Sequence, residues 1–495
     1  MHHEFFNDCW QYVHEGQLDW DFHLLFLIFH LRKHFMNSGV GFRMFMDLAV
    51  VAAKVNIDWD TLANKLKKIG MLEFAKKCYG FIGRWFYIYG PLIDQIDEDF
   101  FEEASQKGKG YKIKVYDYPS LENTDGRRQM RDFAIEDLLY RNAVNVIDEK
   151  TAAWYREKNV LITGGGGSIG SELARQIAKI GPSRLTLLDN YENGVYDIQQ
   201  ELKTRYPELN LRVEIVNVCD RDGVERVLSI NTPDIVLHAA AHKHVPLMEH
   251  NVMEAVKNNV FGTLNVVELC EKYGVKRFIM ISTDKAVNPT NVMGATKRMC
   301  EMIVQSRKGE KTSFSATRFG NVLGSNGSVI PLFRRQIANG GPVTITDKRI
   351  TRFFMTIPEA SQLVMTSGAM AKNGELYVLD MGKPVKIFDL AEEMIRLSGL
   401  EPYKDIDIVE TGLRPGEKLY EELLIKTEEM DKTENDLIFI ERDKPLSEEQ
   451  INEKLDILRE ALATGHNTAV KEALMRVVPT YHTPEEVNGK TKDVD

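Results

Sequence analysis

The sequence has few cysteines, and those it has lie far apart. There are 5 in 495 residues, an odd number, and none belongs to a CxxC motif. This pattern argues against a disulfide framework and a structural zinc site, and it favours a reducing compartment, so we expect a cytoplasmic protein. The histidines at 238, 242, 244 and 250 are not spaced with Cys or acidic residues as in a known zinc site, so we expect no metal.

Long hydrophobic runs are also absent. The most apolar stretch is LLFLIF at 24–29, whereas a membrane-spanning helix needs about 20 apolar residues. The first residues include His2, His3 and Glu4, and they lack the basic start and apolar core of a signal peptide. We therefore expect neither a signal peptide nor an integral membrane segment, and we interpret 24–29 as part of a buried amphipathic helix.

The chain lacks the excess of basic residues that is typical of nucleic-acid-binding proteins. Lys and Arg total 63 and Asp and Glu total 73, which gives a net charge of -10. Nucleic acid is therefore disfavoured as a partner. Hydrophobic residues make up 43% and charged residues 27%, which fits a folded globular protein and excludes a wholly disordered one.

The pattern of apolar residues divides the chain into four regions. Residues 1–105 have apolar positions at three-to-four spacing, which predicts an all-helical N-terminal module. Residues 106–157 start with the sequence QKGKG, which predicts a linker and a segment leading into the next domain. Residues 158–440 form the predicted main domain, and 441–495 a C-terminal helix followed by a polar tail, disordered from 483.

Short apolar strands alternate with helix-length segments after residue 158. The predicted strands end at Thr163, Asp189, Val218, His238, Ser282 and Arg318. This alternation is typical of parallel strands joined by crossover helices. We therefore predict an α/β fold, a Rossmann-type doubly wound parallel sheet with a smaller C-terminal substrate-binding part.

A glycine-rich loop follows the first strand, with the spacing GxxGxxG. Glycines let the backbone approach a pyrophosphate, whose charge is stabilised at the N-terminus of the following helix. A flexible loop without this function is the alternative, but the strand before it and the helix after it favour dinucleotide binding. We assign to the cofactor Gly164, Gly167, Ser168, Ile169 and Gly170.

Asp189 ends the second strand, 19 residues after Gly170. A carboxylate there accepts hydrogen bonds from ribose hydroxyls and repels a 2′-phosphate. The next residues, NYEN at 190–193, contain no Arg or Lys for such a phosphate, so NAD is favoured over NADP. Asp220 is a candidate for the adenine edge, with a helix N-cap as the alternative. Ala239, after the fourth strand, is also assigned to the cofactor.

Thr283, Asp284 and Lys285 follow the strand that ends at Ser282, at the sheet edge where ligands of open α/β folds bind. A polar turn without catalytic function is the alternative. The sequence MGATK at 293–297 comes soon after. It resembles the extended short-chain dehydrogenase/reductase family, in which a Tyr-x-x-x-Lys performs the redox chemistry. Lys297 is present here, and Met293 replaces the Tyr.

Four further motifs make the resemblance more specific: AAAHKHVP at 239–246, STDKA at 282–286, RFGNVLGS at 318–325 and RPGEK at 414–418. Together they are similar to the UDP-N-acetylglucosamine 4,6-dehydratases of bacterial polysaccharide and glycan biosynthesis. The most similar branch also has Met in place of the Tyr. It usually carries transmembrane helices and an extra nucleotide-fold domain at its front, and this sequence shows neither.

The resemblance implies a redox-neutral dehydration. Oxidation of sugar C4 by NAD makes the C5 hydrogen removable by a base, an acid protonates the departing C6 hydroxyl, and the hydride returns to C6. By resemblance Asp284 is the acid, Lys285 the base and Thr283 the partner of the C4 hydroxyl. Lys297 binds the nicotinamide ribose and, with NAD and partial burial, lowers the pKa of the base. With Met293 replacing Tyr, the acceptor of the C4 hydroxyl proton stays open.

The same resemblance implies contacts to the UDP part of a UDP-sugar, because guanidinium groups match a diphosphate and carboxylates accept ribose hydroxyls. Ordinary surface ion pairs are the alternative for these residues. The residues are Lys243, Arg318, Asn321, Arg414 and Glu417.

Residues 1–105 are similar to the helical part of an uncharacterised nucleotidyltransferase family, through FHLL at 22–25, KHF at 33–35 and GVGF at 39–42. The carboxylates that such a transferase needs for its metal are not in place. We interpret this region as an accessory module for docking or oligomerisation, and we expect a homo-oligomer.

These motifs predict an NAD-dependent dehydratase of UDP-N-acetylglucosamine. The alternative enzyme is a UDP-sugar 4-epimerase, which shares the oxidised C4 intermediate but needs no acid at C6. The missing Tyr counts against it. A non-catalytic nucleotide sensor is the alternative from another class, and it would leave Asp284 and Lys285 unexplained.

Overall fold

The computed structural model describes residues 147–307, 311–423, 430–442 and 444–489, with short stretches between residues 13 and 78. The chain forms two compact units, residues 1–126 and 127–495. In the first unit, α4 (Trp59–Lys68) lies where the apolar spacing predicts a helix. β1 (Val13–His14) and β2 (Gln17–Leu18) form a short antiparallel pair that the all-helical prediction did not include. Most other predicted helices of this module, and the predicted linker, lie outside the described residues.

The second unit is built on a nine-stranded sheet in the order β16-β17-β13-β8-β7-β6-β3-β4-β5. The seven strands β13, β8, β7, β6, β3, β4 and β5 run parallel to one another, and β17 and β16 continue the sheet beyond β13 in antiparallel fashion. The strands are β3 (Asn159–Thr163), β4 (Arg184–Asp189), β5 (Leu211–Ile215), β6 (Ile235–His238), β7 (Arg277–Thr283), β8 (Ser313–Phe319), β13 (Glu375–Leu379), β16 (Met430–Lys432) and β17 (Ile438–Glu441).

In chain order, the first six strands of this sheet are arranged 3-2-1-4-5-6, which is the Rossmann order. The predicted α/β fold with a doubly wound parallel sheet is therefore confirmed. β3, β4 and β6 end at the predicted residues. β5 ends at Ile215 rather than at the predicted Val218, because its partner strand β4 ends at Asp189, directly opposite Ile215.

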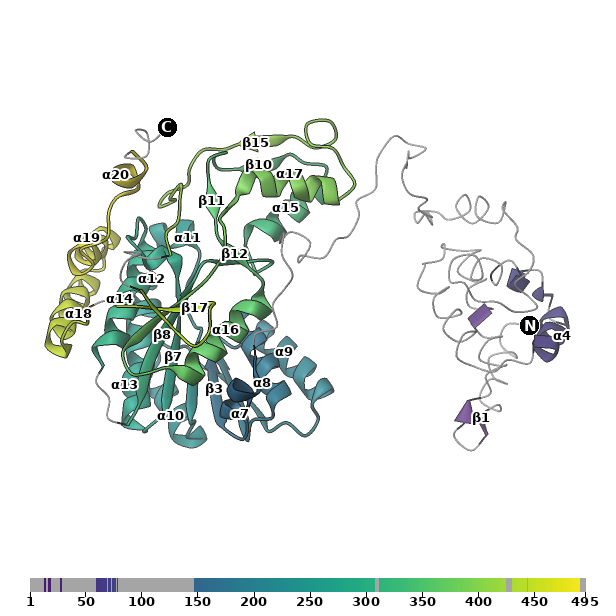
Figure 1. Ribbon diagram of the computed structural model, residues 1–495, viewed down its shortest axis with the longest axis horizontal. Helices are drawn as coiled ribbons and strands as arrows, with labels where there is room; N and C mark the ends of the chain where they lie inside the picture. Colours follow the sequence, from purple (N-terminus) through teal and green to yellow (C-terminus); the bar gives the residue numbers. More distant parts are fainter. Residues whose placement is uncertain are drawn as a thin grey trace. The chain divides into compact units, whose positions relative to one another are not determined.

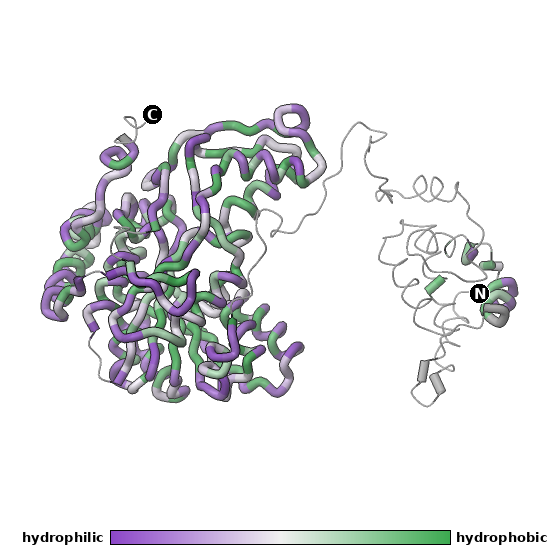
Figure 2. The backbone as a smooth tube through the Cα atoms, viewed as in Figure 1, coloured by the Kyte–Doolittle hydropathy of each residue, from purple (hydrophilic) through white to green (hydrophobic). Residues whose placement is uncertain are grey.

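Helices cover both faces of the sheet (Figure 1). One face carries α7 (Glu149–Tyr155), α8 (Ser168–Ile180), α9 (Glu192–Arg205) and α16 (Ile357–Met370), and the other carries α10 (Arg221–Asn231), α12 (Val252–Ala255), α13 (Gly262–Lys272) and α14 (Val292–Ser306). A separate cluster of buried apolar side chains fills each interface. Figure 2 shows the matching pattern, with hydrophobic residues concentrated in the central strands.

Helix α7 lies in the segment that precedes the main domain in the sequence. Tyr155 on this helix is fully buried, and its hydroxyl donates a hydrogen bond to Met365 O at 3.0 Å. Asp148 caps the helix by accepting from Thr151 N at 2.7 Å. Because Tyr155 belongs to the core between the sheet and α16, the segment from Ile147 packs on the domain.

A smaller part follows β8 in the chain. Its core lies between α15 (Val329–Ala338) and α17 (Ile387–Leu397), together with the parallel pair β10 (Val343–Ile345) and β15 (Ile408–Glu410). Two short pairs connect it to the main sheet region: β9 (Asn321–Val322) with β12 (Phe354–Met355), and β11 (Thr351–Arg352) with β14 (Val385–Lys386). Figure 1 shows this part above the large sheet.

Within the described residues 444–489, the C-terminal segment contains three helices. α18 (Glu448–Ala463) starts with a capping box of Ser447 and Gln450. With α19 (Asn467–Val477) it packs on α12 and α14 and adds apolar side chains to the core. α20 (Pro484–Gly489) corrects the prediction of a disordered tail for residues 484–489. Its Asn488 bonds to the backbone of a distant loop, and a polar sequence gives no sign of such a contact.

Candidate active site

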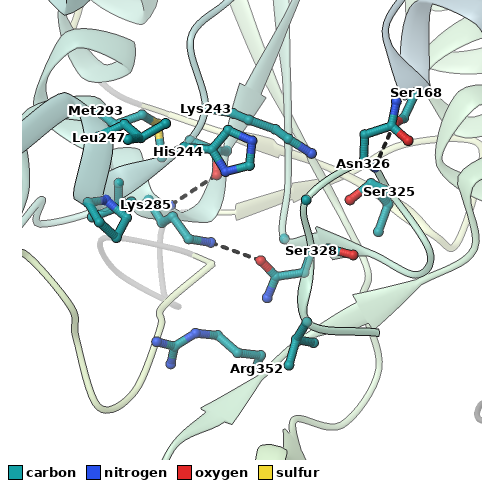
Figure 3. Close-up of a pocket in the computed structure, with 18 of the residues that line it drawn as sticks. Ser168, Lys243, His244, Leu247, Lys285, Met293, Ser325, Asn326, Ser328 and Arg352 are labelled. Atoms are coloured by element: carbon teal, nitrogen blue, oxygen red, sulfur yellow. Dashed lines mark hydrogen bonds between the residues drawn. The ribbon is translucent and has the colours of Figure 1, made fainter. Parts of the chain in front are cut away.

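A cavity of about 930 Å³ lies at the carboxyl ends of the parallel strands, and residues of both the sheet and the smaller part line it. Its walls include the loop after β3, the ends of β7 and β8, the first turns of α14 and parts of the segments 344–354 and 411–421. Figure 3 shows part of this wall. Ligands of open α/β sheets bind at this edge, so the cavity is the candidate active site.

The glycine loop after β3 is shaped by contacts that leave no room for side chains. Gly164 has φ +70°, and a Cβ on it would lie 2.7 Å from the backbone of Ala239 and Ala240. A Cβ on Gly170 would lie 2.0 Å from Gly164 O. Gly167 is the N-cap of α8 and makes no side-chain bond to the first N–H groups of that helix. The first backbone N–H groups of α8 can therefore donate to an anion, and the loop fits the pyrophosphate of a dinucleotide.

The residues assigned to the cofactor from this loop all line the cavity, as does Ala239. Ser168 has a further contact, because its Oγ accepts a hydrogen bond from Asn326 N at 3.1 Å (Figure 3). The loop 325–328 between β9 and α15 is thereby tied to the cofactor loop. Gly327 in it has φ +70°, and a Cβ there would lie 2.5 Å from the His244 ring.

Asp189, at the end of β4, fixes the glycine loop. Its Oδ2 accepts from Gly166 N and its Oδ1 from Tyr191 N, both at 2.9 Å. Each carboxylate oxygen keeps a further lone pair for a ribose hydroxyl, so the ribose assignment stays a prediction. Asp220 is the N-cap of α10, since its Oδ1 accepts from Gly223 N at 3.1 Å. It does not line the cavity, so the N-cap alternative is observed and the adenine contact stays a prediction.

β7 delivers the predicted acid and base as one ion pair. Lys285 Nζ lies 2.8 Å from Asp284 Oδ1 and donates to Asn321 Oδ1 at 3.1 Å. Thr283 Oγ1 donates to the same Asp284 oxygen at 2.9 Å. Thr283, Lys285 and Asn321 line the cavity, and Figure 3 shows the Lys285 side chain extending along its wall. Asp284 is fully buried behind them.

The second oxygen of Asp284 is unusual. Within the described residues, Oδ2 is buried and has no hydrogen-bond partner. A Cβ on Gly320, a residue of the cavity wall, would lie 2.9 Å from it. Buried carboxylate oxygens are nearly always bonded, and exceptions need an explanation such as a catalytic role. Asp284 therefore holds Lys285 and Thr283 with one oxygen and keeps the other unbonded next to the cavity wall.

The first turns of α14 bring Met293 and Lys297 to the cavity. Asn291 caps this helix by accepting from Gly294 N at 2.7 Å. Lys297 is only 5% exposed, and burial lowers the pKa of its ammonium group. Met293 is buried too and offers no group that could accept or donate a proton. The position that holds Tyr in the wider family is therefore an apolar part of this wall.

Further basic side chains also line the cavity. Lys243 and His244 lie just before α11 (Val245–His250), and Figure 3 shows both near Lys285. Burial, with the charge of Lys285, lowers the pKa of Lys243. Arg414 NH2 lies 3.0 Å from Glu417 Oε1, and both residues line the cavity. The alternative of an ordinary ion pair is thus observed for Arg414 and Glu417, although a ligand in the cavity could also contact both side chains.

Arg318 requires a correction. The predicted contact with a diphosphate is wrong, because Arg318 is fully buried and does not line the cavity. Its Nε and NH2 donate to the two carboxylate oxygens of Glu301 at 3.0 and 2.8 Å, and its NH1 pairs with Glu441. The guanidinium group therefore joins β8 to α14 and β17 inside the protein.

Two charged residues of the cavity were not among the predicted site residues. Glu421 lines the cavity with a side chain that is 4% exposed. Burial raises its pKa, although the charges of Lys285 and Arg352 oppose this effect. Arg352 Nε lies 3.9 Å from Glu421 Oε1, and its NH1 and NH2 donate to the carbonyls of Leu419 and Lys418. Glu421 follows the RPGEK motif by three residues, which was the only signal for it in the sequence.

The described part of the chain holds no group of three or more His, Cys, Asp or Glu side chains arranged to bind a metal ion. His238 is fully buried between the hydroxyls of Thr163 and Thr263, and burial lowers its pKa to about 3. It is therefore a neutral residue that links β6 to its neighbours. Among the helices that the structure describes, none has the length and apolar character needed to cross a membrane.

Comparisons with known proteins agree with this geometry. Residues 160–443 match the family described as "Polysaccharide biosynthesis protein". The capsular polysaccharide biosynthesis protein CapD of Staphylococcus aureus is 52% identical over 326 residues, which cover 64% of this chain and 54% of CapD. The chain thus spans about half the length of this relative.

Two relatives carry the names of enzymes. A UDP-N-acetylglucosamine 4,6-dehydratase (inverting) of Campylobacter jejuni is 36% identical over 279 residues, covering 54% of this chain and 77% of that protein. A UDP-glucose 4-epimerase of Rickettsia canadensis is 33% identical over 289 residues, covering 56% of this chain and 81% of that protein.

The N-terminal module has a separate match. Residues 8–87 match a family described as "Uncharacterised nucleotidyltransferase", so the resemblance predicted for this region is confirmed. The match over 160–443 takes in more than half of the chain, including the cofactor loop, the Asp284–Lys285 pair and the RPGEK segment. The chain belongs to the polysaccharide biosynthesis protein family.

Proposed function

We propose that this chain is an NAD-dependent 4,6-dehydratase of UDP-N-acetylglucosamine that acts in polysaccharide or glycan biosynthesis. The observation that carries the proposal is the Asp284–Lys285 ion pair at the end of β7, in a cavity whose other wall fits a dinucleotide. Membership of the family and 36% identity to a relative named as a 4,6-dehydratase support this reaction class.

The glycine loop and α14 hold the cofactor in this proposal. Gly164, Gly167 and Gly170 face the pyrophosphate, Asp189 accepts from the adenosine ribose, and Lys297 binds the nicotinamide ribose. Bound nicotinamide would supply the hydride acceptor that oxidation of the sugar requires. The carboxylate of Asp189, without Arg or Lys at 190–193, favours NAD over NADP.

The proton chemistry belongs to Asp284 and Lys285. A base must be neutral to remove the C5 proton, and an acid must be protonated to donate to the departing C6 hydroxyl. Moving one proton from Lys285 Nζ to Asp284 Oδ1, across 2.8 Å, produces both forms at once. After the elimination, Lys285 carries the C5 proton and Asp284 is again a carboxylate. When the hydride returns to C6, Lys285 gives a proton to C5, and the proton released from the C4 hydroxyl then restores the ion pair.

The sugar nucleotide lies along the remaining walls in this proposal. Thr283 Oγ1 donates to Asp284 and accepts from Lys285 N at 3.4 Å, so one lone pair is left to accept from the C4 hydroxyl. Lys243 and Arg414 provide positive charge for the diphosphate, in place of the buried Arg318. Asn321 and Glu417 line the same cavity and provide polar contacts to the sugar and ribose.

A UDP-sugar 4-epimerase is the second candidate, because a protein with that name is 33% identical over 289 residues. An epimerase returns the hydride to C4 and needs no acid at C6. The buried acid Asp284 and the apolar Met293 therefore support dehydration over epimerisation.

Incubation of the purified protein with UDP-N-acetylglucosamine tests the proposal. The expected result is a product lighter by one water in the mass spectrum, with deuterium at C5 when the reaction runs in D₂O. Bound NAD should copurify with the protein, and the absorbance of NADH should not accumulate. A product of unchanged mass with inverted C4 by NMR would establish the epimerase instead.

A further inference from the structure

The segment from Arg414 to Glu421 forms one wall of the cavity, and its backbone is held from the interior side. Thr290 Oγ1 and Asn291 Nδ2 both donate to Gly416 O at 3.2 Å. Arg352 donates to the carbonyls of Lys418 and Leu419 at 2.8 and 3.1 Å. These bonds come from the two residues before α14 and from β11, and both α14 and β11 carry cavity residues themselves.

The other edge of this segment is held by the C-terminal helix α20. Asn488 Nδ2 donates to Glu417 O at 3.1 Å, and Asn488 Oδ1 accepts from Leu419 N at 3.1 Å. One amide group thus bonds a carbonyl and an N–H two residues apart, as a neighbouring β-strand would. Just before α20, His482 N donates to Pro289 O at 3.0 Å, next to the cap of α14.

The position of this wall matters for binding because three charged cavity residues are attached to it: Arg414, Glu417 and Glu421. A site binds more tightly when its contacting groups are ordered before the ligand arrives. Without the Asn488 bonds, the N–H of Leu419 and the carbonyl of Glu417 lose their protein partners, and the segment can move.

We propose that Asn488 is a positioning residue of the sugar-nucleotide site, which acts by holding the backbone of Glu417 and Leu419. Helix α20 is then an integral support of that site rather than a tail. The inference deepens the proposed function and rests on it, since it assigns the 414–421 wall to the binding of UDP.

The test compares two asparagines that make the same kind of contact. Asn467 Nδ2 donates to His250 O and its Oδ1 accepts from Met253 N, both at 3.1 Å, and Asn467 does not line the cavity. Asn488→Ala and Asn467→Ala each remove one such pair of bonds. The full-length variants are compared by UDP affinity, by kcat and KM for UDP-N-acetylglucosamine, and by melting temperature.

Asn488→Ala is expected to raise the Kd for UDP and the KM roughly three- to tenfold, with kcat within about twofold of the unaltered protein. Asn467→Ala should lower the melting temperature and leave the UDP affinity unchanged. Deuterium uptake in peptides that cover 414–421 should become faster only in Asn488→Ala. If the Ala variant does not fold, Asn488→Asp keeps the acceptor for Leu419 N, and it should show a smaller rise in Kd.

Unchanged UDP affinity in Asn488→Ala, or an equal loss in Asn467→Ala, would overturn the inference. A result that overturns this inference can be distinguished from one that overturns the proposed function. Unaltered protein that binds UDP but forms no dehydrated product would overturn the dehydratase assignment, while the comparison of the two asparagines would still decide the role of Asn488.

Discussion

Lys285 Nζ lies 2.8 Å from Asp284 Oδ1, so the two residues proposed as base and acid neutralise each other before any substrate binds. Asp284 is fully buried, and only 16% of the Lys285 side chain is exposed. The pair therefore acts as a unit, and removal of either member leaves the other without its partner.

The first prediction concerns the acid. Asp284→Asn should reduce dehydration by roughly 10²–10⁴-fold, which is the usual contribution of a general acid or base. Because the residues act as a unit, the double variant Asp284→Asn/Lys285→Met should be hardly slower than either single one. Steady-state rates check this, with bound NAD as the control for folding. A single variant that keeps half of the activity would contradict the acid role.

The second prediction separates the base from the acid. Lys285→Met should stop the exchange of the C5 hydrogen with solvent deuterium, because no neutral amine is left to remove it. Asp284→Asn, by contrast, keeps the Lys285 side chain but lacks the carboxylate that takes its proton, so the exchange should be slowed there rather than stopped. NMR of substrate recovered from D₂O measures the exchange. Continued exchange in Lys285→Met would assign proton removal to another residue.

The third prediction follows from the two bonds that Asp189 makes to the glycine loop. Asp189→Ala combined with an Arg at 190–193 should raise NADP affinity relative to NAD, because the repulsion of a 2′-phosphate is lost. Asp189→Ala should also loosen the loop and weaken both cofactors. Asp189→Asn is the control, since it keeps the acceptor oxygen for one backbone N–H. Tighter binding of NADP than NAD by the unaltered protein would refute the assignment of Asp189.

The fourth prediction uses Glu421, whose pKa burial raises above the ordinary 4.5. Below pH 4.5 the carboxyl of Glu421 is neutral in both the folded and the unfolded protein, and the free energy of unfolding is at its full value. It then falls as the pH rises through the raised pKa of the folded state. Glu421→Gln stays neutral, so it should become progressively more stable than the unaltered protein as the pH increases.

Melting temperatures over a pH series measure this difference for Glu421→Gln. The neighbouring Glu422→Gln is the control, because the Glu422 side chain is 45% exposed and bonds to Lys418 and Asn288 instead. Parallel pH curves for Glu421→Gln and the unaltered protein would show that folding does not raise the pKa of Glu421.

The fifth prediction concerns the buried pair of Glu301 and Arg318. Although burial favours the neutral acid, the charge and hydrogen bonds of Arg318 lower the pKa of Glu301 to about 2. The stability from this carboxylate is present above its ordinary pKa of 4.5 and is lost as the pH falls towards 2.

Glu301→Gln should destabilise the fold by roughly 3–5 kcal/mol at neutral pH, and the loss should shrink below about pH 4.5. Urea unfolding at several pH values tests this, with the exposed Glu434→Gln as the control. If Glu301→Gln keeps its stability but loses UDP affinity, Arg318 would have to be assigned to the substrate site after all.

Much of the fold could be predicted because parallel strands are buried on both faces. Such strands must be continuous apolar runs, and the polar residues that follow them mark where they end. Thr163, Asp189 and His238 end their strands as predicted. The glycine loop and Thr283–Lys285 could be placed at the sheet edge for the same reason, since they are adjacent to those strand ends in the sequence.

The local sequence determined the elements of this protein and the residues at the strand ends, because backbone periodicity and glycine geometry act over a few neighbouring positions. Only the tertiary structure decided which charged side chains reach the cavity. Arg318 is turned away from it by Glu301 and Glu441, which are 17 and 123 residues distant, and Asn488 reaches Leu419 across 69 residues. A buried charge needs an oppositely charged partner, and a buried backbone group needs a hydrogen-bond partner. The fold supplies these partners from distant parts of the chain, so short-range sequence patterns cannot predict them.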